Sequence, residues 1–183
     1  MHLARLLSDH SKLRSLGADL VAIVSSAEPC DFRELARRRW DLARTVHLHL
    51  CFEERELFCR LEADPRPQAR AAGVKGKRSV EQLHSLYKGH VERWNANGVT
   101  SRWPEFQAAV RVMVRRMIAA IDHEEVELFP FLAGGMATGR GRRPGTRNWA
   151  SVGVALQPLI SATAKAALPR QTGLAKQLPV SSA

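Results

Sequence analysis

The sequence is poor in aromatic side chains and in cysteine. Aromatic residues make up 6% of the 183 residues, against 45% for all hydrophobic residues, which suits a helical core of aliphatic side chains. The three cysteines are odd in number and lack metal-knuckle spacing, so no disulfide framework is expected. No apolar run is long enough to span a bilayer, and charges within residues 1–28 do not fit a signal peptide. We therefore expect a cytoplasmic protein that does not insert into a membrane.

The sequence also lacks the alternation of polar and apolar residues that strands show. Apolar residues instead recur at spacings of three and four, which predicts helices over residues 2–26, 31–63, 79–96 and 104–132. Asp31 and Glu34 form a capping box at the start of the second helix, and residues 64–77 are expected to be a loop. The pattern predicts an all-α fold, an antiparallel up-down four-helix bundle over residues 1–133.

Acidic residues are absent from residues 134–183, which carry seven of the 28 basic residues. The net charge of +10 therefore comes largely from this segment. Its glycine, alanine, serine and proline content predicts a basic, largely irregular C-terminal tail, with one short helix allowed over residues 151–167. A basic tail can bind nucleic acid, but no recognition motif accompanies this one, so a solvated extension is the expectation.

A repeated acidic segment is the most informative feature of the chain. Residues 53–58 and 124–129 are identical except where Arg55 becomes Val126. His49 stands four residues before the first copy, so an imidazole and the Glu53 carboxylate share one helix face. In the second copy the matching position is Ala120, and a histidine stands at His123 instead. We interpret the two copies as two halves of a metal site.

The candidate ligands lie at compatible heights in an up-down bundle with a rise of about 1.5 Å per residue. Imidazole and carboxylate suit iron, manganese or zinc. Two glutamates from facing helices can bridge two metal ions and leave open coordination for a small ligand such as O₂. The proposed ligands are His10, His49, Glu53, His90 and Glu124.

Alternatives to this set remain open at two helices. His84 can replace His90, and either His123 paired with Glu127 or His123 beside Glu124 can serve on the last helix. Three other polar residues are expected to face solvent: His47, Glu54 and Glu125. The two glutamates can alternatively support the metal ligands by hydrogen bonds.

Motifs on all four predicted helices resemble the hemerythrin-like family, also described as HHE cation-binding domains. The matching motifs are Asp9-His10 with Leu13, His49 with Glu53-Glu54 and Leu57-Phe58, His90-Val91 with Trp94, and Glu124-Glu125 with Leu128-Phe129-Pro130. The resemblance implies a bundle around a non-haem di-iron centre, with three histidines as terminal ligands and Glu53 and Glu124 as bridges. Two departures, at Leu86 and near Ala120, remove histidines that oxygen carriers of this family use.

The resemblance favours a protein that binds or senses O₂, nitric oxide or iron over an oxygen store. A second hypothesis is a di-iron oxidase or peroxidase-type enzyme, although only one Glu-x-x-His segment of the ferritin kind is present, at Glu81–His84. A third hypothesis is a metal-free helical interaction module whose basic tail binds nucleic acid.

Overall fold

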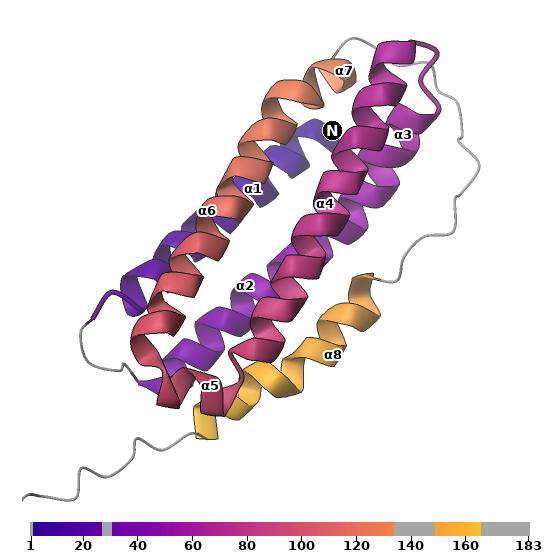
Figure 1. Ribbon diagram of the computed structural model, residues 1–183. Helices are drawn as coiled ribbons and strands as arrows, with labels where there is room; N and C mark the ends of the chain where they lie inside the picture. The colour runs from indigo at the N-terminus through magenta and orange to yellow at the C-terminus, as the bar shows by residue number, and fades with distance from the viewer. Residues whose placement is uncertain (1, 27–30, 134–148, 166–183) are drawn as a thin grey trace, which may run out of the picture.

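The computed structural model describes residues 2–26, 31–133 and 149–165, and these residues form helices and connections without a strand (Figure 1). This part of the chain confirms the all-α class. The helices are α1 (His2–Ile23), α2 (Phe32–Glu53), the π-helical turn η1 (Glu54–Phe58), α3 (Cys59–Glu62), α4 (Pro67–Arg93), α5 (Ala96–Ser101), α6 (Trp103–Glu127), α7 (Phe129–Ala133), α8 (Trp149–Ser161) and the 3-10 turn η2 (Ala162–Lys165). None of the described helices has the length and apolar character needed to cross a membrane.

The long helices α1, α2, α4 and α6 lie roughly side by side and alternate in direction along the chain (Figure 1). Helix α1 packs against α2 and α6, and α4 packs against α6. A further helix, α8, packs against both α2 and α4. The arrangement therefore differs from the expected simple bundle, because a fifth substantial helix takes part in the packing.

Helix α2 begins where the sequence predicts. The Asp31 side chain accepts a hydrogen bond from the Arg33 backbone N–H at 2.9 Å, which satisfies one free donor of the first turn. The helix then passes through η1 into α3 and ends at Glu62, close to the expected end near residue 63. The π-helical turn inserts an extra residue directly after Glu53, at the repeated acidic segment.

The loop expected over residues 64–77 is largely helical, because α4 begins at Pro67. Proline suits a first helical turn, since its missing N–H would have no partner there. The two glycines lie inside the helix where neighbours approach closely. A Cβ on Gly73 would lie 2.6 Å from the Leu61 Cβ, and one on Gly76 would lie 2.7 Å from Leu128 Cδ1. Close packing, and not a turn, explains these glycines.

Residues 149–165 differ from the expected irregular tail. Trp149, Leu156 and Ile160 of α8 are buried. The Arg39 guanidinium on α2 donates 2.9 Å to Thr163 Oγ1 and 2.7 Å to the Trp94 carbonyl, which ties η2 to the long helices. This segment belongs to the folded unit, beyond the predicted boundary at residue 133. The rest of the predicted tail, residues 134–148 and 166–183, lies outside the described residues.

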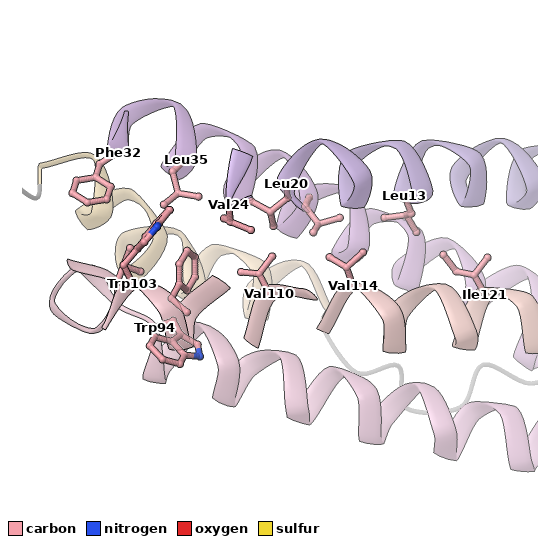
Figure 2. Packing of buried hydrophobic residues seen from close by; sticks show 13 residues of the cluster. Leu13, Leu20, Val24, Phe32, Leu35, Trp94, Trp103, Val110, Val114 and Ile121 are labelled. Carbon is pink, nitrogen blue, oxygen red and sulfur yellow. The ribbon is translucent and has the colours of Figure 1, made fainter. Parts of the chain in front are cut away.

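Two apolar clusters flank one polar level of the protein. The first extends from Phe32 and Trp103 to Leu13 and Ile121 (Figure 2). The second cluster lies around the connection from α2 through η1 and α3 to α4, with further side chains from α1, α7 and α8. Its buried residues are Leu6, Leu50, Phe52, Leu57, Phe58, Leu61, Ala69, Val80, Leu128, Phe129 and Trp149. On α1, His10 stands about one turn before Leu13, and on α6, Glu124 stands about one turn after Ile121. Both positions lie on the side of the second cluster. The candidate ligands therefore lie between two apolar regions.

Candidate metal centre

Helices α1, α2 and α6 bring three buried side chains to one point. Ligand atoms of His10, His49 and Glu124 all lie within 4.8 Å of one another, and the group can hold a metal ion. His10 Nε2 is 3.3 Å from Glu124 Oε2. The rings of His10 and His49 meet edge to face with centroids 4.8 Å apart.

Glu53 completes this group from the end of α2. Its side chain is fully buried, and Oε2 lies 3.7 Å from His49 Nε2. Burial, together with the nearby Glu124 carboxylate, raises the pKa of Glu53 well above its ordinary value of 4.5. Burial and the nearby His10 lower the pKa of His49 to about 4, so its imidazole is neutral and free to ligate a metal.

Five buried polar atoms of these residues have no hydrogen-bond partner within the described part of the chain. They are His10 Nε2, His49 Nδ1, both carboxylate oxygens of Glu53, and Glu124 Oε2. Buried polar groups are rarely left unpaired, because each loses its interaction with water without replacement. A cation bound between His10 Nε2, Glu53 and Glu124 would satisfy most of these atoms, so the donor set fits a metal ion that prefers nitrogen and oxygen ligands.

Glu125 holds the ring of His10 in an orientation suited to ligation. His10 Nδ1–H donates to Glu125 Oε1 at 2.8 Å, and its other ring nitrogen, Nε2, lies 3.3 Å from Glu124 Oε2. Arg14 donates to both oxygens of Glu125, and Phe129 stacks on the His10 ring at 5.2 Å between centroids. Glu125 therefore has the supporting role that was the alternative to a solvated position. Its hydrogen bonds with Arg14 and His10 lower its pKa and keep it ionised.

Replacing Glu125 with glutamine should weaken metal binding by about 10- to 100-fold without changing the number of ions bound, because the His10 ring loses its charged partner. A chelator-competition titration measures this affinity. Glu127→Gln is the matched control, since Glu127 is exposed on the same helix. Equal affinities for the two variants would contradict the role given to Glu125.

Glu54 also departs from its expected exposure. Its carboxylate is buried and lies 2.8 Å from Lys77 Nζ on α4. The two glutamates at the start of the repeat thus have different surroundings: Glu54 has a cationic partner, whereas Glu53 faces the other candidate ligands.

The structure does not bring His90 and His123 to this group. His90 is half-buried beside Arg39, with its ring centroid 6.4 Å from that of Phe106, and burial and the Arg39 charge lower its pKa to about 4. His123 lines an outer groove between α4 and α6, and Glu127 is exposed. Of the five proposed ligands and the alternative His123, four residues lie together: His10, His49, Glu53 and Glu124.

His47 and His84 form a second buried histidine pair that periodicity did not reveal. His47 Nδ1–H donates to the Ala43 carbonyl at 2.6 Å, and its Nε2 lies 3.3 Å from His84 Nε2. The expectation that His47 faces solvent is wrong because α8 covers it, with Gly153 so close that a Cβ would lie 2.9 Å from the His47 ring. His84, the alternative to His90, lines a cavity beside the candidate ligands.

That cavity has a volume of about 70 Å³ and adjoins the candidate ligands. His49, Glu53 and Glu124 lie in its wall, and most of the remaining lining is apolar: Leu13, Leu42, Val46, Leu50, Val80, Leu83, Met113, Val114, Met117, Ala120 and Ile121. The space suits a molecule of a few atoms without charge.

Comparison with protein-family models, with curated proteins and with solved structures found no match. The assignment of a function therefore rests on the geometry of this site and on the sequence motifs.

Proposed function

We propose that this protein is a hemerythrin-like, non-haem iron protein that binds or senses a small uncharged ligand such as O₂ or nitric oxide. The observation that carries the proposal is the set of five unpaired buried atoms on His10, His49, Glu53 and Glu124 beside an apolar cavity. A metal-free interaction module would gain nothing from burying these groups, because their desolvation would remain uncompensated.

His10 and His49 would serve as terminal ligands, and Glu53 and Glu124 would bridge two iron ions. The two carboxylates suit this role because they come from different helices and share one buried space. Zinc or manganese is compatible with the same donor types. Iron, when bound, supplies redox chemistry and open coordination positions for a small ligand.

The residues that line the cavity would select the small ligand by its polarity and size. The apolar side chains of the cavity disfavour ions, because nothing there replaces their hydration. The hydrogen bond from His10 to Glu125 holds one ligand ring in place. Small apolar molecules pass this selection, which favours binding or sensing of a dissolved gas.

Metal content and an optical spectrum of anaerobically purified protein test the proposal. We expect two irons per chain after loading with ferrous iron, and new near-ultraviolet absorption when air is admitted. The double variant Glu53→Gln with Glu124→Gln is the control and should bind no iron. A protein that binds only zinc, or that loads no metal, would overturn the redox proposal.

A further inference from the structure

We propose that small uncharged molecules enter the buried centre through the groove between α4 and α6, past Leu83 and Ala120. This inference rests on the proposed function for the identity of the ligand. The route itself depends only on the shape of the protein. It can therefore be tested in the metal-free chain as well as in the iron-loaded chain.

Two hollows meet where α4 and α6 pack together, which we call the α4–α6 seam. The outer groove has a volume of about 390 Å³ and is lined by Ser79, Gln82, Leu83, Leu86, Arg116, Ala119, Ala120 and His123. The inner cavity of about 70 Å³ adjoins Glu53 and Glu124. Leu83 and Ala120 line both spaces, and both residues are half-buried. Their side chains therefore form the boundary between the outer groove and the candidate metal centre.

Helix α8 closes the alternative approach between α2 and α4. It packs on both of these helices (Figure 1), and its residue Gly153 lies directly against His47. The α4–α6 seam carries no comparable covering helix within the described residues. Its outer face holds the groove, and Leu83 and Ala120 line both the groove and the inner cavity.

The chemistry of the boundary selects for uncharged molecules. Leu83 and Ala120 offer no hydrogen-bonding side chain, so an ion that crosses between them would lose its hydration. Ala120 precedes Glu124 by one helical turn, so a molecule that crosses arrives beside a candidate ligand. Because Leu83 is half-buried, rotation of its side chain can open the boundary without movement of a helix.

Xenon exchange in the metal-free full-length chain tests the route, since apolar cavities bind xenon. Met113 and Met117 line the cavity, and the chain has only four methionines, so labelled methionine methyl groups give a simple spectrum. Leu83→Ala should speed exchange and Ala120→Met should slow it, each by about tenfold, because the first widens and the second narrows the boundary.

The chain offers a matched control for each variant. Leu86 and Ala119 line the outer groove but not the cavity, so Leu86→Ala and Ala119→Met should leave the exchange rate unchanged. Leu83→Ala keeps the test valid should Ala120→Met fail to fold. Absence of xenon from the cavity, or equal rates for Leu83→Ala and Leu86→Ala, would overturn the route.

Stopped-flow mixing of nitric oxide with the iron-loaded chain gives the second readout. Association rates should follow the same order as xenon exchange: fastest for Leu83→Ala, then the parent chain and the controls, and slowest for Ala120→Met. If xenon exchange follows this order but no iron loads, the route stands and the proposed function fails. If nitric oxide binds at equal rates in all variants, the proposed function stands and the route fails.

Discussion

Replacing Glu53 with glutamine should abolish iron binding and, at the same time, stabilise the metal-free protein. The loss of binding follows because the Glu53 carboxylate lies 3.7 Å from His49 Nε2, beside the group of His10, His49 and Glu124 that can hold a metal ion. The gain in stability follows because both Glu53 oxygens are buried without a hydrogen-bond partner in the described part of the chain. At a pH high enough to ionise Glu53, removing its uncompensated buried charge should raise the free energy of unfolding by about 1–3 kcal/mol.

The dependence of stability on pH shows whether the buried Glu53 carboxylate destabilises the metal-free protein. A carboxyl whose pKa is raised by folding binds more protons in the folded state, so the metal-free protein should lose stability as pH rises above 4.5 toward the folded pKa. His49, with its pKa lowered from 6.5 to about 4, acts in the opposite direction between those values. Denaturant unfolding at pH 8 therefore isolates the contribution of Glu53.

Glu54→Gln is the matched control, since it changes the next residue in the same way. Glu54 is also buried but has a partner in Lys77 at 2.8 Å. This variant should keep its iron and lose up to about 1 kcal/mol of stability, because an ion pair is removed and Lys77 keeps Glu62 as a second partner. The interpretation of Glu53 as a ligand fails if Glu53→Gln binds iron like the parent chain or destabilises the metal-free protein.

Local periodicity was sufficient to predict the helical class and the burial of four candidate ligands. His10, His49, Glu53 and Glu124 each lie on the apolar face of a helix, and the structure buries all four. The start of α2 at Asp31 also followed from a local rule, since the Asp31 side chain caps the backbone N–H two residues on. Glu34 does not complete the expected capping box and pairs with Arg37 and Arg38 instead. Such features depend on neighbours within one helix, so the sequence alone contains them.

The features that were missed depend on contacts between distant segments. Glu125 is paired with Arg14 and Glu54 with Lys77, and no pattern within one helix indicates these partners. His47 is buried only because Gly153 of α8 lies over it. His90 passed a test of height along the helices, but height does not fix facing, and packing places it beside Arg39.

Helix α8 should contribute strongly to stability, contrary to the expectation of a solvated tail. Ile160→Ala should lower the free energy of unfolding by about 2–5 kcal/mol, because Ile160 is fully buried against Ala43 and Val91. Val154→Ala on the same helix is the control and should change stability by about 0.5 kcal/mol or less, since Val154 is 65% exposed. Denaturant unfolding measures both. Equal effects would show that α8 is not docked in solution.

Deletion of residues 149–183 extends this prediction to the metal site. If these residues were an independent tail, the shortened chain would keep its helicity and its iron. If α8 packs as described, its loss exposes His47, two residues from His49, and removes the surface that supports α2. We therefore expect the shortened chain to unfold at lower denaturant concentration and to bind iron more weakly, because the ligands on α2 are then less rigidly held. Iron affinity equal to that of the full chain would show that α1, α2, α4 and α6 hold the site without help from α8.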